Sequence, residues 1–241
     1  MTLGIELSQL GHATLAALMK LDELVSLPIA DEHRPHTRSL RDTPLVWTTR
    51  SWRGSNVFDL VRFATIEGEA MSSLTVLIVP RVELAAPVFG ADLVGFGDRY
   101  TFLALDLYAL GRDLARSTTT LLAEARTRLA SVGTTRAREG LPFSPEAALI
   151  SVGRDADPSV IAAAYLRYLD AFDDELERPI RFQHDVAERQ ADYARQMATH
   201  MRAVAPLRKL FGGAWIDRYF TSFFTAPARP HAVAPANLEA R

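Results

Sequence analysis

The sequence predicts an α+β fold, a three-layer α/β/α sandwich around a central, mostly antiparallel sheet of about six strands. Three observations support this prediction. The chain begins with a helical rhythm of leucines, continues with short β-branched and aromatic runs over residues 46–107, and then returns to helical patterns. Helices on both sides of the strand region in the sequence can cover both faces of one sheet.

The first predicted element is a helix over residues 6–26. Its apolar side chains recur at helical spacing, at Leu7, Leu10, Leu15, Leu18, Leu21 and Leu24. The stretch from Asp31 to Asp42 is polar and is predicted to be a loop.

The strand region follows. Its runs are separated by Gly, Pro, Asp and Ser, so the connections are short and an antiparallel meander is the economical arrangement. Residues 74–79 are apolar apart from Thr75, which indicates cover on both faces of the sheet. A sixth strand is predicted at 147–152. The five runs of the meander are 46–52, 57–66, 74–79, 88–96 and 100–107.

The remaining predicted helices begin at residue 111. Asp157 followed by Pro158 is a typical helix start and opens a helix that runs to about Leu176. The predicted helical ranges are 111–132, 158–176, 183–204 and 206–224. Residues 226–241 are rich in Pro and Ala and are expected to be disordered, which leaves residues 1–225 as one expected domain.

Composition excludes several classes of function. The 241 residues carry a formal net charge of -2, so no global attraction to nucleic acid or to an anionic membrane is expected. Cysteine is absent, which removes disulfides, cysteine-ligated clusters, thiolate catalysis and a thioether-linked chromophore. The sequence shows no signal pattern and no membrane-spanning run, so a cytoplasmic location is expected.

Standard catalytic and nucleotide-binding motifs are missing. His33 and His36 have a spacing that could serve a metal. With no nearby cysteine and in a predicted loop, two solvated side chains are the simpler interpretation, and no metal site is expected. Redox chemistry in such a chain would need electrons from a bound cofactor or from a protein partner.

Asp92 is the most unusual residue, because it is a carboxylate inside an apolar strand. Side chains alternate across a sheet, so Asp92 shares its face with the small residue Gly90 and with Val94. A planar ligand could lie there, and desolvation would make Asp92 an acid near neutral pH. The alternative is an aspartate at an exposed strand end or a turn. Asp106 invites the same argument more weakly.

A polar and apolar stripe marks one face of the helix predicted at 183–204. This stripe suits the wall of a pocket, and it equally suits an ordinary amphipathic helix. Its members are Gln190, Tyr193, Met197, His200 or Met201, and Val204.

Two segments resemble the ferredoxin-dependent bilin reductases, and the similarity extends over about residues 45–225. The first runs from Val79-Pro80 through Pro87-Val88-Phe89-Gly90-Ala91-Asp92-Leu93-Val94 to Leu105-Asp106-Leu107. The second comprises Gln190-x-x-Tyr193-x-x-Gln196, Leu207-Arg208-Lys209-Leu210-Phe211-Gly212, Trp215-x-x-Arg218-Tyr219 and Phe223-Phe224. Trp52, Arg62 and Phe63 also fit the early strands of the family.

The resemblance implies an α/β/α enzyme that binds biliverdin or a related bilin between the sheet and the C-terminal helices. It implies no tightly bound cofactor: reduced ferredoxin supplies single electrons, and the protein supplies protons. Asp92 matches the central proton-donating aspartate of the family. A monomer is expected, as is typical of the family.

The chain also departs from the family pattern. Thr75 stands where some members have histidine and others asparagine, and a family glutamate falls near Ala64. His200-Met201 replaces an Asn-Asp pair, so the second family carboxylate is absent. His200 could replace it as a proton donor, or it could be a packing residue.

By this resemblance the expected catalytic residues are Asp92 and His200. Arg202 falls where relatives place a basic residue at a bilin propionate, and Arg154 is a weaker candidate for the same role. Arg208, Lys209 and Arg218 are expected to steer ferredoxin. The expected substrate-binding residues are Thr75, Arg62, Phe89, Tyr193, Met197, Met201, Arg202 and Arg154.

The leading hypothesis is therefore ferredoxin-dependent reduction of biliverdin, or of a dihydrobiliverdin, to a phytobilin that serves as a phytochrome or phycobiliprotein chromophore. Two alternatives remain open. One is a reductase of an open-chain chlorophyll catabolite, and the other is a non-catalytic bilin carrier.

Overall fold

The computed structural model describes residues 3–137, 142–178 and 185–225. The disorder expected at 226–241 concerns residues outside these ranges. No helix in the described ranges has the length and apolar character needed to cross a membrane.

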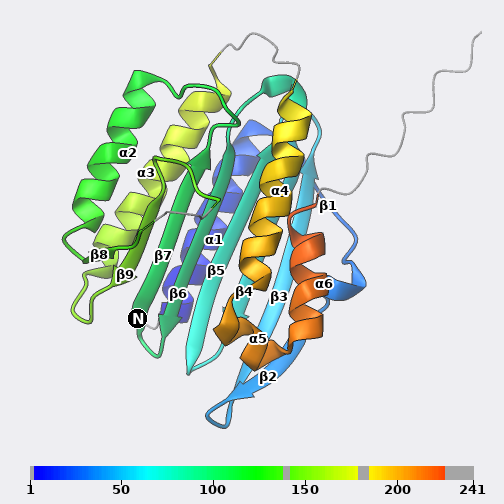
Figure 1. Ribbon diagram of the computed structural model, residues 1–241, viewed down its shortest axis with the longest axis vertical. Helices are drawn as coiled ribbons and strands as arrows, with labels where there is room; N and C mark the ends of the chain where they lie inside the picture. The colour runs from blue at the N-terminus through cyan, green and yellow to red at the C-terminus, as the bar shows by residue number, and fades with distance from the viewer. Residues whose placement is uncertain (1–2, 138–141, 179–184, 226–241) are drawn as a thin grey trace, which may run out of the picture.

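One antiparallel sheet forms the middle layer of the molecule (Figure 1). Its strand order is β1-β3-β4-β5-β6-β7-β9-β8, and β2 also pairs with β3. Strands β3 to β7 follow one another in sequence and in space, which confirms the predicted meander. The strands are β1 (Leu24–Ser26), β2 (His36–Leu40), β3 (Thr43–Gly54), β4 (Phe58–Glu67), β5 (Met71–Pro80), β6 (Val88–Phe96), β7 (Arg99–Tyr108), β8 (Gly133–Thr135) and β9 (Ala148–Val152).

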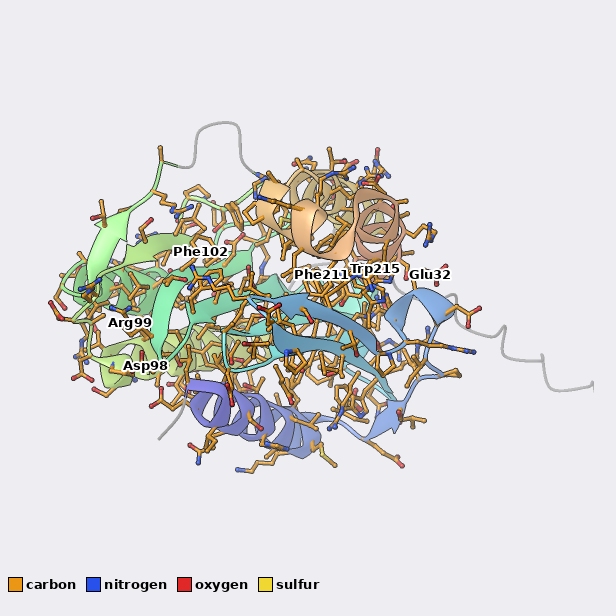
Figure 2. The ribbon with its side chains drawn as sticks, turned by 90° about the horizontal axis from the view of Figure 1, so that it is seen from below. Glu32, Asp98, Arg99, Phe102, Phe211 and Trp215 are labelled. Carbon is orange, nitrogen blue, oxygen red and sulfur yellow. The ribbon has the colours of Figure 1, made fainter. Side chains whose placement is uncertain are left out.

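Helices cover both faces of the sheet and confirm the three-layer prediction. Three of them, α1 (Leu3–Leu21), α2 (Arg116–Leu129) and α3 (Pro158–Leu176), pack on one face around a core that includes Phe58, Phe89 and Tyr165. Figure 2 shows the opposite face, where Phe211 and Trp215 lie between the sheet and the C-terminal helices. These helices are α4 (Val186–Arg202), α5 (Ala205–Phe211) and α6 (Gly213–Phe223).

The sheet has nine strands, so the prediction of about six was too low. The three missed strands are the short edge strands β1, β2 and β8. Residues 31–42 were wrongly predicted to be a loop, because β2 is polar and its side chains are largely exposed. Its hairpin with β3 turns at Arg41 and Asp42, which both have positive φ angles of 53° and 64°. Neither strand nor turn carries the usual sequence signal.

The N-terminal helix ends at Leu21, five residues earlier than predicted. Asp22 follows it and accepts hydrogen bonds from the backbone N–H groups of Asn56, Val57 and Phe58, at 3.0, 2.7 and 3.2 Å. This side chain therefore ties the end of α1 to the β3–β4 turn. The chain then enters β1 and pairs with β3, so the helical spacing of Leu24 is coincidental.

Two further helix boundaries differ from prediction. The helix expected from residue 111 begins at Arg116, since Leu110 and Gly111 adopt positive φ angles of 53° and 80°. The helix expected over 206–224 is two helices, because Gly212 has φ +89° and ψ 133° and breaks the chain direction between α5 and α6. By contrast, Asp157 caps α3 as predicted, accepting from the Ser159 N–H at 2.8 Å.

Candidate active site

Asp92 lies in the middle of β6, on the face of the sheet that carries the C-terminal helices. Its cross-strand partners are Thr75 on β5 and Ala104 on β7. The Thr75 hydroxyl donates a hydrogen bond of 2.8 Å to Asp92 Oδ1. One carboxylate oxygen of Asp92 is therefore held by the Thr75 hydroxyl.

The environment of Asp92 makes it an acid near neutral pH. Desolvation raises its pKa from 3.8 to about 6, and the Thr75 hydroxyl works in the opposite direction by stabilising the charged form. A group with this pKa holds its proton for part of the time at pH 6 to 7. It can therefore donate a proton and be reprotonated from solvent without a large free-energy cost.

The sheet surface around Asp92 is only partly covered. On the opposite face, Leu93, Leu103 and Leu105 are fully buried. On the Asp92 face of the same central strands, a connected group of side chains is partly exposed. Its members are Thr75, Gly90, Asp92, Val94, Phe102 and Tyr108, and Figure 2 shows Phe102 on the side of the C-terminal helices. Central strands with uncovered side chains form a floor on which a flat ligand can lie.

Helix α4 forms one wall above this floor (Figure 1). Gln190 Nε2 donates to the Pro80 carbonyl at 2.9 Å, which fixes the N-terminal part of the helix at the end of β5. Tyr193 packs its ring on Tyr108 with centroids 4.7 Å apart, and its hydroxyl lies 3.1 Å from the position a Cβ would take at Gly90. Met197 is buried and Met201 packs partly buried in the same cluster.

His200 lies near the C-terminal end of α4 and is partly exposed. Its ring meets the edge of Phe143, with centroids 5.7 Å apart and planes at 81°. Burial lowers its pKa below the usual 6.5, so the imidazole is predominantly neutral at pH 7. A neutral imidazole still donates a hydrogen bond through one nitrogen, but it is a weaker proton donor than Asp92 with its raised pKa.

Arg202 is the last residue of α4. It lines a cavity of about 560 Å³ between α4 and α6, with an apolar floor that includes Leu77, Val79 and Val88. Its guanidinium donates to the Ala198 carbonyl and to the hydroxyls of Thr199 and Thr221. In the described ranges these acceptors are neutral and no carboxylate pairs with Arg202.

Two expected substrate-binding residues have structural roles instead. Phe89 is fully buried on the opposite face of the sheet, with its ring centroid 5.9 Å from that of Tyr165, so it cannot contact a ligand beside Asp92. Arg62 does lie on the Asp92 face, but its guanidinium is engaged in hydrogen bonds at the end of α6. It donates to the carbonyls of Ser222 at 2.8 Å, of Phe223, and of Thr225 at 3.5 Å.

Arg154 also lies away from the site. It is exposed in the turn after β9, and β7 separates β9 from the strand that carries Asp92. Arg154 is therefore not part of the group of side chains around Asp92 that would contact a propionate bound there. The reason is topological: Arg154 follows a strand toward the far edge of the sheet.

The two histidines of the possible metal motif have other partners. His33 is buried, so the interpretation of it as a solvated side chain was wrong, and its Nε2 lies 2.8 Å from the Ser222 hydroxyl. The His36 ring stacks on Trp215, with ring centroids 4.4 Å apart. Across the described ranges, no three His, Asp or Glu side chains gather closely enough to hold a metal ion. Sequence inspection missed Phe143, which stood in a loop without periodicity and reaches the site only through the fold.

The fold and these residues can be compared with known proteins. A family model described as ferredoxin-dependent bilin reductase matches residues 12–224. The phycoerythrobilin:ferredoxin oxidoreductase of Gloeobacter violaceus is 28% identical over 226 residues, covering 88% of this chain and 91% of the relative.

Among solved structures, tomato phytochromobilin synthase in complex with biliverdin has a TM-score of 0.67. Its sequence identity is 20%, and the alignment covers 90% of this chain and 82% of the tomato chain. At this identity the likeness shows a shared fold, which agrees with the three-layer sandwich described above. The family model spans nearly the whole described chain, from α1 to the end of α6, and it includes the strand that carries Asp92. The chain belongs to the ferredoxin-dependent bilin reductases, a family of oxidoreductases that act on CH–CH groups of tetrapyrroles.

Proposed function

We propose that this protein reduces biliverdin, or a dihydrobiliverdin, to a phytobilin, with Asp92 as the proton donor. The observation that carries the proposal is a carboxyl group with a raised pKa on a partly uncovered sheet floor, beneath an aromatic and methionine-containing helix face. Tyr193, Met197 and Met201 are assigned to the wall of the bilin site. Thr75 is assigned to orienting Asp92.

Reduction of one double bond consumes two electrons and two protons. Reduced ferredoxin supplies the electrons one at a time, and Asp92 supplies a proton to the bilin after an electron has arrived. Asp92 then regains a proton from solvent, which its pKa of about 6 permits, and supplies the second proton after the second electron has arrived. His200 is assigned a supporting role, since its neutral imidazole can donate a hydrogen bond to a lactam or pyrrole group.

Arg202 is our candidate for recognising a propionate of the bilin. A guanidinium offers two parallel donors to a carboxylate, and the Arg202 side chain currently donates to neutral oxygens at the edge of the α4–α6 cavity. Replacing Arg202 by Gln should raise the Kd for biliverdin about tenfold with a smaller effect on turnover at saturation, because one charge-assisted contact is lost.

Ferredoxin docking is assigned to the basic residues of α5 and α6. Lys209 and Arg218 are exposed and free to meet an acidic partner surface, whereas Arg208 is paired with Asp217 at 2.5 Å and is less available than expected. Complex formation through such exposed charges should weaken as salt is added.

Biliverdin titration followed by addition of reduced ferredoxin tests the proposal. The expected results are a shifted absorption spectrum on mixing and a ferredoxin-dependent conversion to a product identified by chromatography. Asp92→Asn should bind biliverdin but reduce turnover at least about 100-fold, because the proton donor is lost. A bilin radical should then accumulate and be detectable by electron paramagnetic resonance.

Asp98→Asn is the matched control. Asp98 follows the same strand, but its side chain is 88% exposed in the β6–β7 turn, so turnover should stay at the wild-type rate. Wild-type turnover in Asp92→Asn would refute the role of Asp92. A persistent biliverdin spectrum that reduced ferredoxin leaves unchanged in the wild type would favour a carrier, and the absence of any spectral change would exclude both.

A further inference from the structure

Asp106 is a second carboxyl group on the Asp92 face, and the proposed reaction does not use it. It lies on β7 opposite Gly90, while Asp92 lies on β6 opposite Ala104, so the two aspartates are diagonal neighbours on adjacent strands. Asp106 is 1% exposed, in contrast to the partly exposed Asp92. Burial raises the pKa of the neighbouring Tyr193, and the negative charge of Asp106 acts in the same direction.

Asp106 binds the segment that crosses this side of the sheet before β9. The Ser144 hydroxyl donates to Asp106 Oδ1 at 2.5 Å, and the Ser144 backbone N–H donates to Oδ2 at 3.2 Å. Both carboxylate oxygens therefore accept hydrogen bonds from one residue. Asp106 therefore anchors Ser144. Both of its oxygens are engaged by that residue and not by the uncovered floor around Asp92.

The next two residues are anchored from two other elements. Arg126 of α2 donates to the Pro145 carbonyl at 3.0 Å, and the Tyr168 hydroxyl of α3 donates to the Glu146 carbonyl at 2.6 Å. The chain at 144–146 is therefore held from β7, α2 and α3. A segment held at three successive residues has little freedom to change its path.

Phe143 immediately precedes these anchored residues and reaches α4, the helix that forms one wall of the site. Its ring meets the His200 ring of α4 and packs against the cluster that contains Tyr193 and Met197. The contact joins the 142–147 segment, on the β7 side, to α4, which lies over the other side of the floor. The path fixed by Ser144 thus determines where the Phe143 ring lies.

We propose that Asp106 is a positioning residue: with Ser144 it holds Phe143 against His200, and the Phe143 ring forms the wall that sets how the tetrapyrrole lies over Asp92. This inference rests on the proposed bilin reductase function. It assigns Asp106 no proton transfer to the bilin. Loss of the anchor should change the geometry of the bound bilin while leaving the acid at Asp92 intact.

Ser144→Ala and Phe143→Leu test the inference. Ser144→Ala removes the hydroxyl donor and keeps the backbone contact, while Phe143→Leu keeps all three anchors and removes the ring. Both should shift the absorption spectrum of bound biliverdin. Both should also raise the KM for biliverdin about fivefold, as expected for loss of one net contact, with the pH at which kcat falls unchanged.

Ser131→Ala is the matched control, because its hydroxyl donates only to the local Arg128 carbonyl at 2.7 Å and is exposed. Unchanged spectra and KM values in folded Ser144→Ala and Phe143→Leu would overturn the inference. So would an Asp106→Asn variant that keeps the wild-type spectrum but accumulates the radical, since that result would make Asp106 a proton donor. If the wild type neither binds nor reduces biliverdin, the proposed function is wrong. If the wild type is active and the variants match it, only the positioning role of Asp106 is wrong.

Discussion

At the scale of single residues, the pairing of Thr75 with Asp92 controls the acid of the site. The Thr75 hydroxyl stabilises the carboxylate and so lowers a pKa that desolvation raises to about 6. Because the protonated form is the donor, turnover should fall as pH rises through about 6. The threonine therefore sets the upper pH limit of activity.

Thr75→Val should move this limit upward. Removing a hydrogen bond to the charged form raises the pKa of Asp92, by roughly one unit if one charged hydrogen bond is lost. The measurement is the pH dependence of kcat at saturating ferredoxin. Thr65→Val is the control, since Thr65 bonds Thr48 on the opposite face. An unchanged or lowered pH limit in Thr75→Val would contradict the assignment.

The sequence predicted the site residues unevenly, for physical reasons. Asp92 stood out because a carboxylate inside an apolar strand is costly unless it has a use. Phe89 was assigned by its place in a motif, although its odd spacing from Asp92 already puts the two on opposite faces. Arg62 could not be interpreted from sequence, since its acceptors lie about 160 residues away at the end of α6.

At the scale of elements, Arg62 acts as a cap for the C-terminal end of α6. The last carbonyls of a helix lack intrahelical donors, and the Arg62 guanidinium supplies them from β4. Burial lowers its pKa to about 10, so it stays charged at neutral pH. It also donates to the Ser51 hydroxyl at 2.8 Å, which fixes the side chain in place.

Arg62→Met should lower the free energy of unfolding by about 3 kcal/mol, because three buried or partly buried carbonyls would lose a donor. Urea unfolding followed by circular dichroism measures this change. Arg50→Met is the comparison, since Arg50 is exposed on the neighbouring strand and should have little effect. Equal stability of the two variants would rule out the capping role.

Gly212 determines where α5 ends and α6 begins. Its φ of +89° with ψ 133° is a conformation that residues with a Cβ rarely adopt, although open space surrounds the position. Gly212→Ala should therefore cost about 1–3 kcal/mol of stability from backbone strain alone. Gly11→Ala, inside α1, should instead be neutral or stabilising in thermal unfolding. A Gly212→Ala variant with wild-type stability would contradict this account.

At the scale of the whole molecule, buried titratable groups give opposing dependences of stability on pH. The raised pKa values of Asp92, about 6, and Asp106, about 7, contribute stability below pH 3.8 that is lost as pH rises through 6 to 7. The pKa of His33 is lowered to about 4, mainly by burial. Its contribution is present above pH 6.5 and is lost as pH falls toward 4.

Between pH 4 and 6 two carboxyl groups oppose one histidine, so the offset is partial and the wild type should lose stability gradually as pH rises there. Relative to the wild type, His33→Gln should become less stable as pH rises. The double variant Asp92→Asn/Asp106→Asn should become less stable as pH falls. Urea midpoints at several pH values measure both slopes, and parallel pH profiles for all three proteins would disprove the offset.

The overall architecture was predictable because its determinants are repeated along the chain. Each apolar strand of five or more residues and each amphipathic helix repeats its hydrophobic pattern over many side chains, which makes the pattern easy to detect. The edge strands β1, β2 and β8 were missed because three to five polar or mixed residues carry no periodicity. They form by pairing with a neighbour that is already in place, which sequence patterns do not record.

The uninterrupted meander from β3 to β7 has a consequence for how the protein folds. Its strand pairs connect neighbours in sequence, so the loops that must close are short, and local contacts of this kind form quickly. Thr75 and Asp92 are only 17 residues apart and meet within this unit. The helices that complete the site join later through contacts of long range, such as Arg62 to the end of α6. We therefore expect the acid of the active site to assemble in an early-folding part of the chain, before the walls that enclose its substrate.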